Sequence, residues 1–155
     1  MRYFPFLLII FVLSGCGGEK AADTETEAPT SMVGEDTSPT DESWKENKGV
    51  GPVTEIVFGD AIDEEMAEEG KGLYNIYCLA CHKINEDYIG PAPKDIYKRR
   101  TPEWVANMII NPEEMLAKDP IARQLLIDYN NVPMASMGLD EDQARKILEF
   151  FRTIE

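Results

Sequence analysis

The chain has 155 residues and is strongly acidic, with 29 Asp and Glu against 15 Lys and Arg, a net charge of −14. The acidic surplus persists in residues 49–155, which hold 20 acidic and 11 basic side chains, a net charge of −9. This balance argues against nucleic-acid binding and against electrostatic attraction to anionic lipid, because both need a basic surface. Residues 49–155 suffice for one compact domain.

Residues 1–15 have the composition of a cleaved export signal, with Arg2 ahead of an apolar run. This run is shorter than the about 20 residues that span a bilayer. The Leu-Ser-Gly-Cys sequence ending at Cys16 resembles a bacterial lipobox, in which the cysteine is acylated and becomes the mature N-terminus. The alternative is an ordinary secretory signal beside a free cysteine. Lipidation of Cys16 would explain the odd cysteine of an exported protein.

Residues 16–48 are expected to form the lipidated N-terminus and an acidic, disordered tether. Positions 17–48 hold nine acidic residues against three lysines and almost no large apolar side chain. Such a segment cannot bury enough surface to offset the entropy cost of ordering. As a flexible coil it would reach roughly 30 Å on average.

Helix signals dominate the domain, and its one strand-like run is the short segment 54–58. Apolar residues at helical spacing predict a first helix over about residues 61–77, with acidic residues complementing its N-terminal dipole. Gly70 and Gly72 lower the helix propensity of this segment. They make more sense if another helix crosses closely there.

A C-x-x-C-H sequence follows, with thiols at Cys78 and Cys81 and then His82, the single histidine of the chain. This is the attachment signature of a c-type haem. Thiols at this spacing can form thioethers with the two vinyl groups on one porphyrin edge, and the adjacent imidazole can ligate the iron. A thioredoxin-like redox pair would want a neighbouring βαβ pattern. A structural zinc site needs four ligands and would have to recruit Cys16.

We therefore expect one covalent haem c and no disulfide, since lipid and haem account for all three cysteines. Bacterial c-type haem is attached outside the cytoplasmic membrane, so the motif and the export signal indicate the same compartment. Turn-forming residues at 88–93 should form a loop that folds back along the proximal side of the haem.

Three helix starts follow, each with a capping residue before a proline at the first helical position. They predict short helices over about residues 102–110, 112–118 and 120–129. The capping residues are Thr101, Asn111 and Asp119. A final helix is predicted over about residues 141–154, with Asp140 and Gln143 placed for a capping box.

Lys98, Arg99 and Arg100 form a basic cluster ahead of the second helix. One arginine could pair with a haem propionate and another could present a positive spot to a partner, or the cluster is simply solvated. Trp104 could donate its indole N–H to a propionate or pack in the core.

With no second histidine, the distal axial position is left to methionine, lysine, water or nothing. Methionine is a soft thioether donor that suits haem iron and raises its potential. Met134 and Met137 lie in the irregular stretch 130–138, where a loop can aim a side chain across a cofactor. Met108 and Met115 are interpreted as helix-core packing.

The order of these features resembles the class I cytochrome c family over roughly residues 60–155, nearly the whole domain. The resemblance implies an all-α class I fold of about four or five helices around one covalent haem. It implies thioethers at Cys78 and Cys81, His82 as the proximal ligand and the methionine after Pro133 as the distal ligand, which is Met134 rather than Met137. It also implies that the Pro91 carbonyl accepts a hydrogen bond from the imidazole.

In that family Gly70 and Tyr74 of the first helix would pack against Phe150 or Phe151 of the last. The segments KGVGPV, RRTPEW, INPEEM, KDPIA and YNNVPM further resemble a group of Bacteroidetes lipoprotein cytochromes, some of which accompany nitrous-oxide reductase.

The sequence thus predicts a lipid-anchored electron carrier rather than an enzyme, with no small-molecule substrate. Its partners would be redox proteins with a positive docking patch, such as an oxidase, a reductase or a quinol-oxidising complex. The alternatives are a gas-binding or sensing haem protein and a fixed subunit of an oxidase or reductase complex. We expect it in the bacterial cell envelope, facing the periplasm. Gly17 stands where aspartate retains lipoproteins at the inner membrane, which favours the outer membrane.

Overall fold

The computed structural model describes residues 43–155. The predicted export signal, the predicted lipidation site Cys16 and most of the predicted tether fall outside the described residues. Within residues 43–155 the structure has helices and no strand, which confirms the all-α prediction. No helix there is long and apolar enough to cross a membrane. The elements are η1 (Ser43–Lys45), α1 (Glu64–Tyr77), η2 (Ile96–Lys98), α2 (Pro102–Ile110), α3 (Pro112–Lys118), α4 (Pro120–Asp128) and α5 (Glu141–Arg152).

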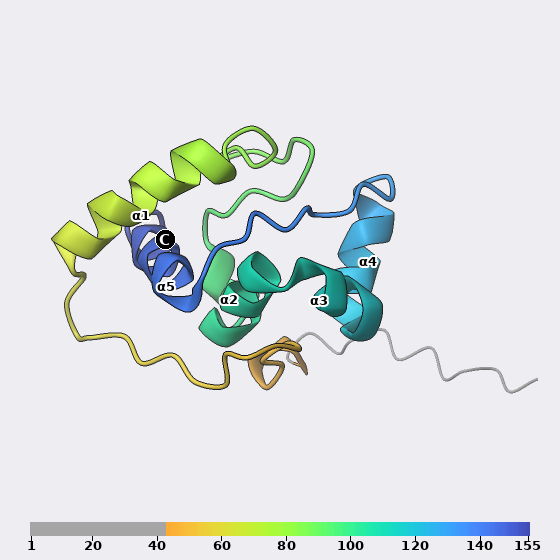
Figure 1. The fold of residues 1–155 in the computed structure, drawn as a ribbon, viewed down its shortest axis with the longest axis horizontal. Helices are drawn as coiled ribbons and strands as arrows, with labels where there is room; N and C mark the ends of the chain where they lie inside the picture. Colours follow the sequence, from red (N-terminus) through yellow and green to blue (C-terminus); the bar gives the residue numbers. More distant parts are fainter. Residues whose placement is uncertain (1–42) are drawn as a thin grey trace, which may run out of the picture. The chain divides into compact units, whose positions relative to one another are not determined.

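The close crossing of α1 and α5 organises the core (Figure 1). A Cβ on Gly70 would lie 1.9 Å from the carbonyl oxygen of Lys146, so only glycine lets the two backbones meet there. Beside this point the buried Tyr74 ring packs on Phe150 and Phe151, with centroid distances of 5.4 and 5.8 Å. The predicted crossing is confirmed at Gly70.

Gly72 does not share this role. Among the described residues, no atom beyond its own helix backbone and chain neighbours lies within 4 Å of a Cβ built at Gly72, so the close helix crossing predicted there is wrong. Two residues further along a helix, a position has turned by about 200°, which takes Gly72 to the far side of α1 from Gly70.

Helix caps hold two of the three proline starts as predicted. Thr101 accepts a hydrogen bond from the Trp104 amide at 3.2 Å, and Asp119 accepts one from the Ala122 amide at 2.8 Å. Asn111 is the N-cap of α3, as predicted, but its side chain makes no cap hydrogen bond. Asn111 also ends α2, which fixes its φ and ψ at −134° and 57°, outside the extended conformation of the other caps. The predicted capping box of α5 is confirmed.

Residues 47–58, here called the strap, lie extended across α2 and α3. Asn107 of α2, 1% exposed, holds the strap with its whole side-chain amide. Its Oδ1 accepts from the Val53 N–H at 3.0 Å, and its Nδ2 donates to the carbonyls of Lys48 and Val53, both at 2.9 Å. The strand-like run 54–58 lies in the strap and pairs with no strand of the described residues.

The strap corrects the predicted end of the tether at residue 48. Asn47 donates to Asp119 at 2.7 Å, and its carbonyl accepts from the Thr101 hydroxyl at 2.6 Å. Trp44 packs against the core. The polar composition around Asn47 predicted a solvated tether. The polar groups of Asn47 instead have partners more than 50 positions away in the sequence.

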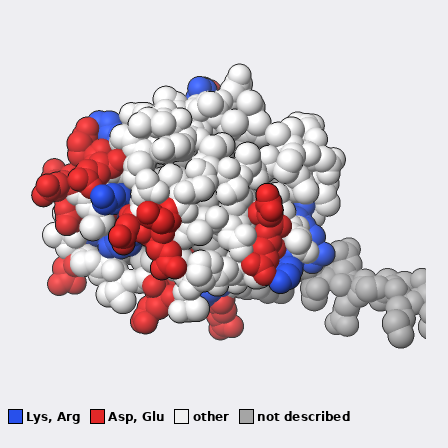
Figure 2. Space-filling view, in the orientation of Figure 1, with Lys and Arg blue, Asp and Glu red and all other residues white. Residues whose placement is uncertain are grey.

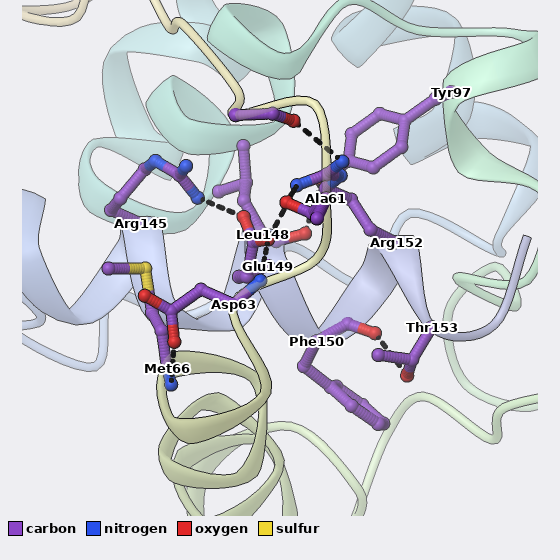
Figure 3. A network of polar contacts seen from close by, with 11 residues as sticks. Ala61, Asp63, Met66, Tyr97, Arg145, Leu148, Glu149, Phe150, Arg152 and Thr153 are labelled. Carbon is purple, nitrogen blue, oxygen red and sulfur yellow. Dashed lines mark hydrogen bonds and ion pairs between the residues drawn. The ribbon is translucent and has the colours of Figure 1, made fainter.

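A buried carboxylate fastens the chain after the strap to α5 (Figure 3). Glu149, 1% exposed, accepts from Arg145 at 2.7 Å, from Arg152 at 2.5 Å and from the Asp63 backbone N–H at 2.8 Å. Burial alone would raise the pKa of Glu149, but these hydrogen bonds and the two positive charges lower it below its usual value. Both guanidinium groups also lie over the Phe58 ring, at 4.7 and 4.9 Å from its centroid.

Candidate haem site

A largely apolar cavity with a volume of about 240 Å³ opens among residues of all five α-helices. The extended segment between α4 and α5 forms one wall, and the loop after α1 forms another. The structure brings the predicted ligands of the described residues together, because all of them line this one cavity. They are Cys78, Cys81, His82, Met134 and Met137.

The cysteine motif is shaped by the end of α1. Cys78 is the C-cap of this helix, and its backbone N–H still donates to the Tyr74 carbonyl at 2.8 Å. The amides of Cys81 and His82 then both donate to the Cys78 carbonyl, at 3.0 and 2.9 Å. This tight turn presents both thiols and the imidazole to the cavity.

The Cys78 thiol lies in a largely apolar environment. Burial, reinforced by the neighbouring Cys81, raises the pKa of Cys78 to about 11. The thiol is therefore protonated at neutral pH.

His82 is fixed by the loop that follows it, defined here as the proximal loop, residues 83–93. Its Nδ1 lies 2.8 Å from the Pro91 carbonyl oxygen, which can only accept, so Nδ1 carries the proton and Nε2 is left to bind a metal. The hydrogen bond to Pro91 is confirmed. A Cβ on Gly90 would lie 2.4 Å from the imidazole, so the loop can approach the ring only with glycine here.

Three methionines line the cavity, one more than the sequence indicated. Met134 is half-buried and Met137 is 44% exposed, and both come from the segment after α4. Met108 of α2 also reaches the cavity, although its helical spacing indicated core packing. Met115 is fully buried, and its sulfur accepts the Val50 N–H at 3.0 Å, which confirms its core role.

The basic cluster divides into residues with different surroundings. Arg99 and Arg100 line the cavity, whereas the exposed Lys98 pairs with Asp95 at 2.6 Å. The Nε of Arg100 is buried without a hydrogen-bond partner among the described residues. Its guanidinium lies over the Trp104 ring, 5.2 Å from the centroid.

Trp104 is a core residue and not a free donor. Its indole N–H donates to the Asp119 carboxylate at 3.1 Å, so the alternative of a propionate donor does not hold in this structure.

One pair at the cavity edge carried no sequence signal. The Tyr129 hydroxyl, from the end of α4, donates to the Asp87 carboxylate of the proximal loop at 2.7 Å. Tyr129 also lines the cavity. The two residues lie 42 positions apart in irregular segments, so neither spacing nor periodicity relates them.

The cytochrome c family model matches residues 67–155, more than half of the chain. The chain belongs to the cytochrome c family. A cytochrome c from Rhodothermus marinus is 42% identical, with a TM-score of 0.65 over 67% of this chain and 89% of that one. An engineered cytochrome c from the same organism, described as bound to a carbene intermediate, is 41% identical with a TM-score of 0.62, over 67% of this chain and 89% of that one.

A cytochrome c domain from Pseudomonas putida is more distant, at 26% identity and a TM-score of 0.50 over 54% of this chain and 85% of that one. No curated protein matches the chain.

As a class I cytochrome c, the protein binds one covalent haem c and transfers electrons. When bound, the haem iron carries one electron by cycling between its ferrous and ferric states. The residues present fit this group. Two thiols and an imidazole with its Nε2 left to bind a metal face an apolar cavity, and the Arg100 Nε, which has no partner in the part of the chain that the structure describes, suits an anionic substituent.

Proposed function

We propose that this cytochrome c is a dedicated single-electron carrier in which Cys78 and Cys81 form the thioethers and His82 and Met134 are the axial ligands. The observation that carries this assignment is the hydrogen bond from His82 Nδ1 to Pro91, because it fixes the imidazole with Nε2 available. The apolar walls would exclude water from the iron and so help to set the potential.

Met134 is the better distal candidate of the two loop methionines. Its side chain is half-buried in the cavity wall, whereas Met137 is more exposed and precedes Gly138, whose φ of +66° turns the chain away toward α5. Met134 also follows Pro133, as the distal ligand often does in the family.

The haem propionates would lie beside the basic cluster. Arg100 is the favoured partner, because no described residue accepts a hydrogen bond from its buried Nε, and a buried donor without an acceptor costs about 1–3 kcal/mol. Burial and the neighbouring Arg99 lower the pKa of Arg100, but a guanidinium remains charged at neutral pH and can pair with a carboxylate.

The carrier would be attached to the cell envelope through lipid on Cys16 and face the periplasm, with the outer membrane favoured over the inner. The lipobox-like sequence and the glycine at position 17 support this placement. The acidic tether would let the domain search the nearby surface and raise its effective concentration around membrane-bound partners. A Cys16→Ala variant should then leave the membrane fraction while retaining its haem.

Its partners would be redox proteins with a positive docking patch, namely an oxidase, a quinol-oxidising complex or a reductase, with nitrous-oxide reductase among the candidates. The net charge of −9 in residues 49–155 supports this. Figure 2 shows acidic side chains gathered toward the α1 end of the molecule. The exposed acids on α1 are Glu64, Glu65, Glu68 and Glu69. Association should therefore slow as salt is added.

The absorption spectrum of the reduced, haem-loaded protein, with and without carbon monoxide, tests the axial ligation. We expect a low-spin spectrum that carbon monoxide does not change. Met134→Ala should open the site to carbon monoxide, and the matched control Met137→Ala should leave it closed. Ready binding to the unmodified protein would favour the gas-binding alternative. Stable co-purification with a larger complex would favour the fixed-subunit alternative.

A further inference from the structure

The carboxylate of Asp87 joins the two axial sides of the cavity. One oxygen accepts the backbone N–H of Ala92 at 2.8 Å, and the other accepts the Tyr129 hydroxyl at 2.7 Å. Ala92 directly follows Pro91, whose carbonyl holds His82. Tyr129 is the C-cap of α4 and directly precedes the methionine-bearing stretch. The Asp87 side chain therefore connects the loop that supports the proximal ligand to the residue at which the methionine-bearing segment begins.

The segment that carries Met134 makes few other hydrogen bonds with the described residues. Residues 130–138, here called the distal segment, begin with a fixed turn in which Asn130 and Asn131 adopt φ of 60° and 57°. The Asn131 N–H closes this turn on the Leu126 carbonyl at 2.8 Å. Beyond Val132, the one hydrogen bond within or to the distal segment from any described residue is a 3.5 Å contact between Gly138 and Ser136. The segment is thus held mainly at its ends.

The hydrogen bonds that Asp87 accepts keep its carboxylate ionised. Its bond from Ala92, its bond from Tyr129 and the nearby Arg99 lower the pKa of Asp87. Burial and the hydrogen bond to Asp87 raise the pKa of Tyr129 to about 12, so the phenol keeps its proton. Arg99 also donates to the carbonyls of Ala92 and Lys94 and braces the proximal end of this contact.

We propose that the Asp87–Tyr129 hydrogen bond is a latch that holds the distal segment against the proximal loop. Its function is to control how readily an external ligand replaces the distal ligand on the iron. This inference rests on the proposed function, in which Met134 is that ligand. Tyr129 is a positioning residue, because it acts through the segment that carries Met134 and not on the iron itself.

The variant that removes only the latch is Tyr129→Phe in the full, haem-loaded chain. We would measure the rate and affinity of imidazole binding to the ferric protein, since imidazole must displace the distal ligand. A hydrogen bond to a charged group at a partly exposed site predicts about five- to tenfold faster displacement. The matched control is Tyr88→Phe. Tyr88 lies beside Asp87 in the proximal loop, is 60% exposed, and its hydroxyl has no hydrogen-bond partner among the described residues.

The latch is supported if Tyr129→Phe binds imidazole faster while Tyr88→Phe behaves like the unmodified protein. The absorption band of methionine-ligated ferric haem should persist in both variants before imidazole is added, which a displaced ligand or a loosened fold would not allow. The latch is overturned if Tyr129→Phe binds at the unmodified rate, or if both variants accelerate equally.

Met134→Ala separates this failure from failure of the proposed function. If Met134→Ala binds imidazole much faster than the unmodified protein while Tyr129→Phe does not, the methionine ligation stands and the latch alone is wrong. If Met134→Ala binds no faster, Met134 is not the ligand, and the latch is overturned with it.

Discussion

Two regions of this protein satisfy their buried polar groups in opposite ways. One is the packed core formed by the strap, α1 and α5, here called the strap side, and the other is the lining of the haem cavity, here called the cavity side. On the strap side, Asn107 and Glu149 are almost fully buried, and each makes three hydrogen bonds within the chain. On the cavity side the lining is mostly apolar, and Arg100 has a buried nitrogen without a partner among residues 43–155. On the strap side the polypeptide itself supplies the hydrogen-bond partners, whereas the cavity side is filled by the haem that the protein binds.

This difference separates the residues that set stability from those that set the chemistry. Substitutions on the strap side should lower the free energy of unfolding, because they strand buried polar groups or separate packed helices. Substitutions on the cavity side should mainly change the haem. The predictions that follow test this division, beginning with the largest expected effect.

Replacing Gly70 should prevent α1 and α5 from packing together on the strap side. Gly70→Val places side-chain atoms where the Lys146 carbonyl of α5 now lies, so we expect a loss of more than about 4 kcal/mol and little accumulation of folded, haem-loaded protein. Gly72→Ala is the matched control. A Cβ there would meet no other described residue within 4 Å, and alanine should add about 0.5–1 kcal/mol of helix stability. Urea unfolding measures both, and a similar loss in the two variants would contradict the crossing.

Neutralising Glu149 should lower the free energy of unfolding by a smaller amount than replacing Gly70. Glu149→Gln removes the anion between two arginines, and we expect a loss of about 3 kcal/mol at pH 7. Because the pKa of Glu149 is lowered on folding, its contribution is present above the ordinary glutamate pKa of about 4.3 and is lost as pH falls through the folded value.

The difference in unfolding free energy between Glu149→Gln and the unmodified protein should therefore shrink as the pH falls below about 4. A difference that stays constant down to pH 2 would contradict the lowered pKa.

Changing Arg100 should leave stability nearly intact and alter the haem. Removing its positive charge favours the ferric state, so Arg100→Gln should lower the reduction potential by tens of millivolts, where about 59 mV corresponds to a tenfold change in a one-electron equilibrium. Arg123→Gln, on an exposed position of α4, is the control and should change the potential far less. Equal shifts in a redox titration would show that only net charge matters.

Sequence reasoning succeeded where the determining interactions are local. The starts of α2, α3 and α4 follow from a proline at the first helical position, and the α5 capping box needs only Asp140 and Gln143. The haem motif is likewise contained in five positions. Asn111 makes no side-chain cap hydrogen bond, because it both ends α2 and begins α3, and a preference read at one site does not include this double role.

The interactions that were missed join distant segments. Asn107 reaches the strap across 54 and 59 positions, and Tyr129 reaches Asp87 across 42. Their partners are often backbone groups, which exist at every residue and leave no mark in the sequence. The polar character of residues 43–48 was correctly seen, but polarity alone does not show whether a segment is solvated or bonded to the domain.

The anchoring of the strap also brings the two limits of the described domain near each other. The Asn47 carbonyl is held by Thr101, and the side chain of Glu155 accepts from the Tyr97 backbone N–H at 3.3 Å. Positions 97 and 101 can be no more than about 15 Å apart along the chain. The two limits of the described domain thus contact the same short segment, residues 97–101, and limits that lie this near each other suit circular permutation and insertion into a host protein.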